Sequence, residues 1–213
     1  MVIPMEILLL ILGWLFGLLS PAIVDAIRDR RDREVVKGVL LSELHELRYR
    51  LMMHVYQVES KYGNLNHKFF EWAQSVVTEY RGINSSESLL NTIGPLLKLS
   101  EEEMAAYAQM ARAHRQSHGG LSLRKHALAM MDANLKSIGS FDPVFRGRVL
   151  EIKTRLEFLN EIIDDARYYF QLSFQNGITP ENYQIANVNL VQTYKFYAEC
   201  TKDIIEIIGK LSK

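Results

Sequence analysis

The stretch ILLLILGWLFGLLSPAIV, residues 7–24, contains no formally charged side chain, and RDRRDR, residues 28–33, follows it after three residues. In a helix, about 18 residues span close to the ~30 Å hydrocarbon core of a bilayer. We therefore expect residues 1–27 to form a transmembrane anchor and residues 28–35 to form a charged juxtamembrane helical stalk. The remaining residues, 36–213, are long enough for one cytoplasmic helical bundle domain with its own core.

A cleaved signal peptide is the alternative interpretation of the apolar segment. The residues before it carry Glu6 and no Lys or Arg, whereas a signal peptide has a positive n-region, and no A-x-A-like site closes the run. We therefore expect an uncleaved anchor. Its basic residues lie on the C-terminal side, at Arg28, Arg30, Arg31 and Arg33. Because Lys and Arg near a span favour the cytoplasmic side, we expect the N-terminus outside and the C-terminal domain in the cytoplasm. The small size, the one anchor and the unbroken helical body suit a bacterial inner (plasma) membrane protein.

The overall charge balance gives no indication of a nucleic-acid partner, because 25 Lys and Arg residues oppose 25 Asp and Glu residues. In the stalk, Asp and Glu lie four residues from Arg, which predicts a solvated helix. Binding of anionic lipid headgroups is the other interpretation of the same residues. The single cysteine, Cys200, agrees with a cytoplasmic domain, since exported chains more often use cysteines in pairs.

Within the apolar stretch, Gly13 and Gly17 form a G-x-x-x-G step that places two residues without side chains on one helix face. A second helix can approach such a face closely, so we expect the bilayer itself and a second copy of the chain as partners, through the anchor and the bundle. Glycines that are incidental in an apolar helix are the alternative. Pro21 predicts a kink or a break at the cytoplasmic end.

The rest of the chain is expected to be helical, because five prolines and twelve glycines punctuate it and no stretch alternates as a half-buried strand does. The first helix is expected to continue from the stalk to a C-cap near Gly63. Its apolar residues recur at steps of three and four, close to the 3.67-residue period of a straight helix. They are Leu40, Leu44, Leu47, Leu51, Val55, Val58 and Tyr62.

Four shorter helices are predicted at about residues 65–81, 86–97, 101–117 and 122–138. Ser100 with Glu103 predicts a capping box for the third of these. Two long helices follow, the first capped by Asp142 and ending at 176–177, the second starting at 179–181. Their short connection makes them antiparallel. The fold class is therefore all-α, with an N-terminal transmembrane helix that continues into an elongated antiparallel helical bundle. The apolar seams are Val149, Ile152, Leu156, Leu159, Ile163, Ala166 and Phe170, and then Leu190, Tyr194, Tyr197, Thr201, Ile204, Ile208 and Leu211.

Catalytic and metal-binding motifs give little support for an enzyme. His114 and His118 have the i,i+4 spacing of a zinc pair, but Arg115 adjoins the first and no glutamate lies between them. Di-iron bundles need Glu-x-x-His on two helices, and no histidine here has a glutamate three residues earlier. Phosphate-binding G-x-x-x-x-G-K and G-x-S-x-G motifs are absent from the sequence. We expect no metal, no cofactor and an inert Cys200 thiol.

Two arginine–histidine pairs, Arg48 with His54 and Arg112 with His118, match the Arg-x4-6-His spacing of the helical HEPN ribonucleases. With 14 arginines and six histidines in the chain, about one such match is expected by chance. The residues after the two arginines, Tyr49 and Ala113, are not the polar residue that is usual in that family. These four residues are the only catalytic candidates in the sequence.

Three classes of function fit the sequence. The first is a non-enzymatic, membrane-anchored scaffold or recruitment module, which binds a cytoplasmic protein partner and needs only the visible features. The second is a self-assembling membrane effector, for example in bacterial defence, which perturbs the bilayer or forms pores. The third is a degenerate HEPN-like ribonuclease. We favour the first because it adds no assumption.

Overall fold

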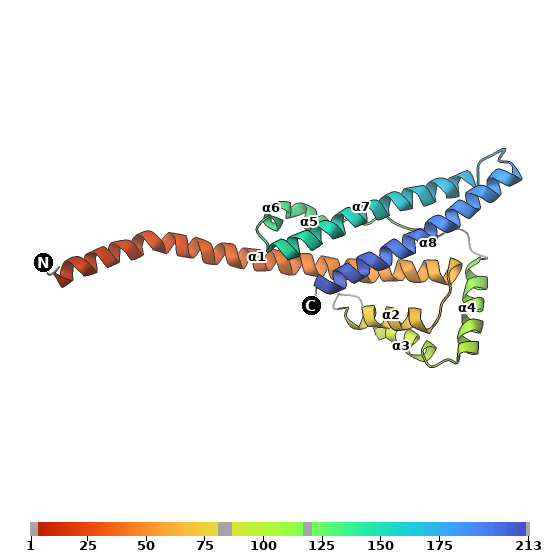
Figure 1. The fold of residues 1–213 in the computed structure, drawn as a ribbon, viewed down its shortest axis with the longest axis horizontal. Coiled ribbons are helices and arrows are strands. Elements are labelled where there is room, and N and C mark those ends of the chain that lie inside the picture. The colour runs from red at the N-terminus through yellow and green to blue at the C-terminus, as the bar shows by residue number, and fades with distance from the viewer. Residues whose placement is uncertain (1–3, 81–86, 117–120, 212–213) are drawn as a thin grey trace.

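The computed structural model describes residues 4–80, 87–116 and 121–211 of the 213-residue chain. Within these ranges, the side chains of residues 6–8, 11, 12, 15, 18–20, 22, 115 and 116 are outside the description. The described residues form eight helices and no strand, so the all-α fold class is confirmed. The molecule is elongated, with one long helix running through most of its length (Figure 1).

Helix α1 (Met5–Tyr62) extends for 58 residues. Pro21 lies inside it without ending it, so the predicted break does not occur, and the N-terminal part bends relative to the rest (Figure 1). Over the described residues, no helix presents an apolar window long enough to cross a membrane. Part of the predicted anchor is not described: residues 1–3 lie outside the described chain. The side chains of residues 6–8, 11, 12, 15, 18–20 and 22 are also outside the description.

The C-terminal half of α1 forms the centre of the bundle. Its predicted seam is confirmed except for its half-buried last residue, Tyr62. The other members, Leu40, Leu44, Leu47, Leu51, Val55 and Val58, are all buried. The helix ends as predicted, with the backbone N–H of Gly63 donating to the carbonyl oxygen of Glu59 at 3.1 Å.

Three shorter helices follow on one side of α1, namely α2 (His67–Thr78), α3 (Glu87–Leu96) and α4 (Glu101–Gln116), each within a few residues of its predicted bounds. The capping box of α4 is confirmed. Ser100 N–H donates to the Glu103 carboxylate at 2.8 Å, and Glu103 N–H donates to the Ser100 hydroxyl at 3.2 Å.

The helix predicted at 122–138 is wrong for its first half and holds for its second half, which is divided into two short helices. Residues 121–128 have no regular secondary structure and are followed by α5 (Ala129–Ala133) and α6 (Leu135–Ile138). We call residues 121–128 the strap. Leu123 and Leu128 of the strap and Met131 of α5 are buried in the common core. Side chains of other elements bind the backbone here, including Glu43, whose carboxylate accepts from Met130 and Met131 N–H at 2.9 and 3.1 Å.

The last two helices, α7 (Pro143–Leu172) and α8 (Pro180–Leu211), form the predicted antiparallel hairpin. Asp142 caps α7 by accepting from Phe145 N–H at 2.9 Å. Helix α7 ends four residues before the predicted 176–177, and Gly177 has a φ of 80° in the turn, a conformation that favours glycine. Helix α8 packs against α7 and also against α1. Both predicted seams are buried except for their half-buried last residues, Phe170 and Leu211.

Candidate functional site

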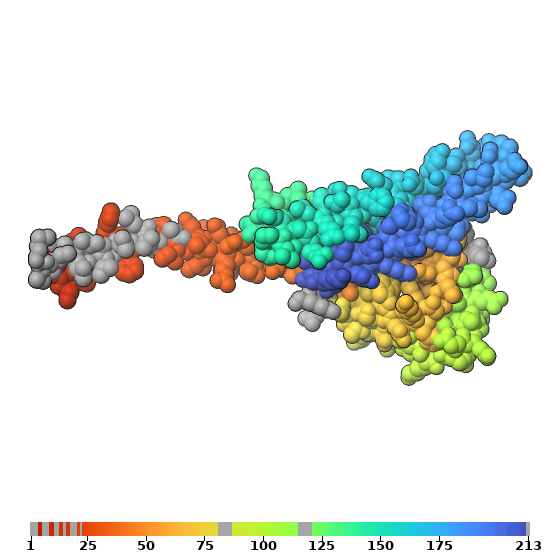
Figure 2. Space-filling view, viewed as in Figure 1, coloured from red at the N-terminus to blue at the C-terminus, as the bar shows by residue number. Residues whose placement is uncertain are grey.

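The part of α1 before the bundle, residues 4–35, forms an exposed N-terminal arm. In Figure 2 it projects from the body as a single helix. Large apolar side chains of the arm have no cover, with exposed fractions of 75% for Leu10, 66% for Trp14, 65% for Phe16 and 64% for Ile27. An apolar helix of this kind is expected to be covered by lipid or by another protein chain, because soluble monomers rarely expose large continuous apolar surface.

The predicted helix-packing glycines lie on the open surface of the arm. A Cβ atom added at Gly13 or Gly17 would meet no described atom within 4 Å. The basic residues of the stalk, Arg28, Arg30, Arg31 and Arg33, are exposed as well. The Arg33 Nε–H donates to the backbone carbonyl oxygen of Asp29 at 3.2 Å.

Arg48 is not a surface residue, since only 7% of it is exposed. Its Nε–H donates to the carbonyl oxygen of Ile205 in α8 at 3.1 Å, and Nη1 donates to the Glu79 carboxylate at 2.7 Å. The guanidinium also fills the space beside Gly209, where an added Cβ would lie 2.8 Å from Nη2. Arg48 therefore joins α1 to α8 and to the end of α2.

His54 contacts a different part of the bundle from Arg48. Its Nδ1 lies 3.0 Å from the Tyr197 hydroxyl of α8, and the same hydroxyl lies 3.4 Å from Nε2 of His126 in the strap. We call these three residues the histidine–tyrosine cluster. The two imidazole centroids are 5.0 Å apart. Because a hydroxyl has one proton, Tyr197 can donate to one imidazole while it accepts from an N–H of the other.

The environment of the cluster favours its neutral forms. Burial, with smaller contributions from His54 and Arg50, lowers the pKa of His126 to about 4. Burial and the charge of Arg124 lower the pKa of His54. Burial raises the pKa of Tyr197. An imidazole pair without charge and a protonated phenol suit a structural network better than acid–base catalysis near pH 7.

The strap is held to α7 by a two-point contact next to the cluster. The Asn160 side-chain oxygen accepts from His126 N–H at 2.9 Å, and its amide nitrogen donates to the His126 carbonyl oxygen at 2.8 Å. Lys125 adds a salt bridge to Asp164 at 2.5 Å. One asparagine thus satisfies both backbone polar groups of a residue that is not in a helix.

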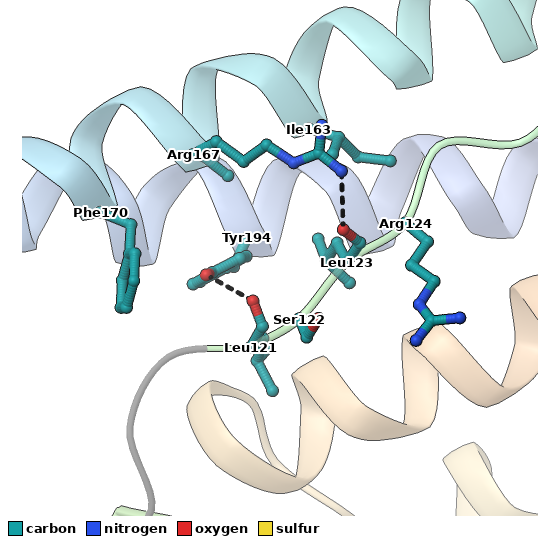
Figure 3. A pocket seen from close by; sticks show the side chains of 9 residues that line it. Leu121, Ser122, Leu123, Arg124, Ile163, Arg167, Phe170 and Tyr194 are labelled. Atoms are coloured by element: carbon teal, nitrogen blue, oxygen red, sulfur yellow. Dashed lines mark hydrogen bonds between the residues drawn. The ribbon is translucent and has the colours of Figure 1, made fainter.

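Beside the strap lies an open cavity of about 400 Å³, lined in part by Ile163, Phe170 and Tyr194 (Figure 3). The Tyr194 hydroxyl donates to the Leu121 carbonyl oxygen at 3.1 Å, and Arg167 donates to that of Leu123 at 3.5 Å. Figure 3 shows Arg124 pointing away from these side chains. Two polar residues that line the cavity, Tyr194 and Arg167, thus hold the strap.

The second arginine–histidine pair is only partly described. Arg112 is exposed on α4, and its Nη2 donates to the Gly63 carbonyl oxygen at 2.6 Å, which ties α4 to the end of α1. His118 lies outside the described residues, so the predicted pair with Arg112, and the i,i+4 pair with His114, cannot be placed. Among the residues that are described, no three His, Cys, Asp or Glu side chains gather as metal ligands.

Cys200 is half-buried on α8. Burial, together with the nearby charges of Asp203 and Glu199, raises the pKa of its thiol. A protonated thiol is a poor nucleophile.

The sequence did not single out Asn160, His126 or Tyr197 as functional residues. The periodicity places Tyr197 on the seam of the last helix as a core aromatic, and His126 is a lone histidine in a segment with a helical pattern. A polar Asn160 between the buried Leu159 and Ile162 was the one local signal. Their association depends on contacts across 34 to 143 residues of sequence, which local patterns do not contain.

The low pKa of His126 makes the stability of the bundle depend on pH. The unfolded chain binds a proton at the ordinary histidine pKa of 6.5, whereas the folded chain binds it only near pH 4. The unfolded state therefore holds more protons in this window, and we expect the free energy of unfolding to fall by roughly 2 kcal/mol between pH 6.5 and pH 4. Urea unfolding at several pH values measures this fall in the free energy of unfolding. His126→Gln should flatten this dependence, and equal slopes in both proteins would refute the assignment.

Comparisons with known proteins do not assign this chain to a family. No protein-family model matches the chain, and neither a curated protein nor a solved structure shows a significant match.

Proposed function

We propose that this protein is a single-pass membrane protein whose helical bundle acts as a non-enzymatic scaffold or recruitment module at the cytoplasmic face of the inner membrane. The observation that carries the proposal is the continuity of α1. One uninterrupted helix begins in an exposed apolar arm and ends in the core of the bundle. A bilayer around residues 7–24 would cover the apolar arm, and the exposed arginines after it would lie at the cytoplasmic headgroups.

The bundle itself supports binding rather than catalysis. The buried Arg48 and the histidine–tyrosine cluster are each occupied by contacts that hold elements together. Arg48 and His54 bind different partners, so the described contacts do not join this predicted arginine–histidine pair. The ribonuclease alternative therefore gains no support, and we do not propose it.

Fractionation of cells that express the full chain tests the proposal. We expect the protein to stay in the membrane pellet after an alkaline carbonate wash and to need detergent for release. Leu10→Lys with Phe16→Lys should move it to the soluble fraction, because each lysine costs about 3 kcal/mol near the centre of a span.

A matched control uses two other exposed apolar residues, Met110 and Val144, which are 64% and 74% exposed on the bundle. Met110→Lys with Val144→Lys should leave the protein in the pellet. Release of the unmodified chain by carbonate alone would contradict the proposal.

A self-assembling membrane effector remains the second candidate. The open face at Gly13 and Gly17 favours it, because no described atom lies within 4 Å of an added Cβ there. Two such faces allow close packing of two helices in a bilayer. This candidate predicts that copies of the chain associate through the arm. Crosslinking of the Gly13→Ile with Gly17→Ile variant tests this association.

A further inference from the structure

The end of the α7–α8 hairpin extends past the end of α1. Tyr62, the last residue of α1, stacks on Tyr194 of α8 with ring centroids 5.3 Å apart. The α8 residues before Tyr194, 180–193, therefore reach about 21 Å beyond that point at 1.5 Å per residue. We call residues 168–190 the hairpin tip. In Figures 1 and 2 it projects from the body at the end opposite to the N-terminal arm.

The surface of the hairpin tip combines apolar and amide side chains and is almost without charge. Five large side chains are about half exposed or more: Tyr168, Phe174, Tyr183, Ile185 and Val188. Glu181 is the one charged residue among residues 168–190, whereas 23% of the whole chain is charged. Seven of the polar residues are amides, namely Gln171, Gln175, Asn176, Asn182, Gln184, Asn187 and Asn189. A patch of this composition is typical of a protein interface rather than of a solvated helix pair.

The tip also has a hollow of about 380 Å³ between the end of α7 and the start of α8. Tyr169, Leu172 and Ile185 are among its apolar lining residues, and Asn182 and Asn189 are among its amides. An apolar surface with amide groups around it can accept side chains from a partner and hydrogen-bond at the edge.

We propose that the hairpin tip binds the hairpin tip of a second copy of this chain, so that the two pairs of helices form a four-helix bundle. A two-helix hairpin buries only one face of each helix, and a second hairpin covers the remaining apolar faces. In a twofold interface, each residue meets the same patch on the partner, so the patch must be complementary to itself. Amides donate and accept hydrogen bonds, and one carboxylate per copy adds little repulsion.

A charged partner fits this surface less well. Complementary charges usually steer association and specify the partner, and the hairpin tip has almost none to offer. A second copy also fits the elongated shape, because the tip and the N-terminal arm lie at opposite ends (Figure 1). Two copies side by side, related by an axis along their length, would have both arms at the same end. This arrangement deepens the proposed function, since two arms would then enter one bilayer.

Disulfide crosslinking of the full chain in membranes tests the pairing, with Cys200→Ser as background. Asn187→Cys places a thiol on the exposed surface of the tip, and Glu102→Cys places one on α4 as a control. We expect a disulfide-linked dimer from Asn187→Cys and little from Glu102→Cys. Ile185→Arg with Val188→Arg should lower the Asn187→Cys dimer by about tenfold or more, because four like charges then meet at the interface.

Three comparisons make the result decisive. Met110→Arg with Val144→Arg should leave the dimer unchanged, and circular dichroism should show equal helicity in all variants. Gly13→Ile with Gly17→Ile should leave the tip crosslink in place, whereas its loss would assign the dimer to the arm and overturn the proposal. The absence of an Asn187→Cys dimer would also overturn the proposal, and so would a different protein crosslinked at that position. Carbonate extraction of the same samples shows separately whether membrane anchoring fails.

Discussion

Arg48→Ala should lower the free energy of unfolding by about 3 kcal/mol, the largest effect of any single polar substitution that we expect in the bundle. The substitution removes the hydrogen bonds to the Ile205 carbonyl oxygen and to the Glu79 carboxylate. It also opens a space beside Gly209 that the guanidinium fills. The cost is at the lower end of the range for buried ion pairs, because the Glu79 side chain is 42% exposed and water can partly solvate it.

Arg50→Ala is the matched control. Arg50 is on the same helix, but its side chain is 65% exposed and it forms an i,i+4 salt bridge with Glu46 at 3.2 Å. Such surface pairs contribute about 0.5 kcal/mol, so urea unfolding should separate the two variants clearly. A ribonuclease would behave differently: Arg48→Ala would abolish RNA cleavage while the stability stayed near that of the unmodified protein. That pair of results would show that our structural assignment of Arg48 is wrong.

Asn160→Ala should be the next most destabilising change, at about 2 kcal/mol. Two hydrogen bonds to the His126 backbone are lost, and a buried N–H or carbonyl group left without a partner costs about 1–3 kcal/mol. In this variant, amide hydrogen exchange in the strap, residues 121–128, should become faster than in the unmodified protein. Exchange in α7 and α8 should increase less. The loss should be local, because α7 and α8 pack against each other without the strap.

Asn160→Asp separates the two hydrogen bonds. Aspartate keeps an acceptor for the His126 N–H but places a second acceptor against the His126 carbonyl oxygen, so it should also destabilise the bundle. Asn91→Ala, which changes an exposed asparagine on α3, should change stability by less than about 0.5 kcal/mol. Unchanged exchange in the strap of Asn160→Ala would contradict the two-point contact.

The long helices were predictable because their apolar residues repeat at helical spacing. Leu51 and Val55 on α1 and Leu156 and Leu159 on α7 are buried as their periods indicate. The capping box at Ser100 was predictable too, since its residues are local in sequence. In these cases, local propensity and tertiary burial favour the same structure.

The strap was not predictable from its own sequence. Residues 121–138 have a helical distribution of apolar side chains, but Asn160, Glu43 and Tyr194 satisfy backbone groups that a helix would otherwise pair internally. These partners come from distant parts of the chain, and tertiary contacts override the local preference.

The buried contacts of Arg48 were not predictable either, for a related reason. Its position, four residues after Leu44 and three before Leu51, places it on the buried face of α1, and this spacing was visible in the sequence. The acceptor groups that compensate its charge, Glu79 and the Ile205 carbonyl oxygen, were not. Burial of an arginine depends on such partners, so it requires the fold.

The central claim of this account is that the apolar N-terminal arm lies within a bilayer while the bundle lies outside it. The two tryptophans of the chain report on each part separately, because Trp14 is on the arm and Trp72 is on α2. The measurement is the fluorescence of Trp72→Phe, which retains only Trp14, in vesicles of lipids brominated along the acyl chains. We predict blue-shifted emission that the bromines strongly quench, while Trp14→Phe, which retains only Trp72, is not quenched. Equal emission of Trp14 with brominated and ordinary lipids would contradict the account.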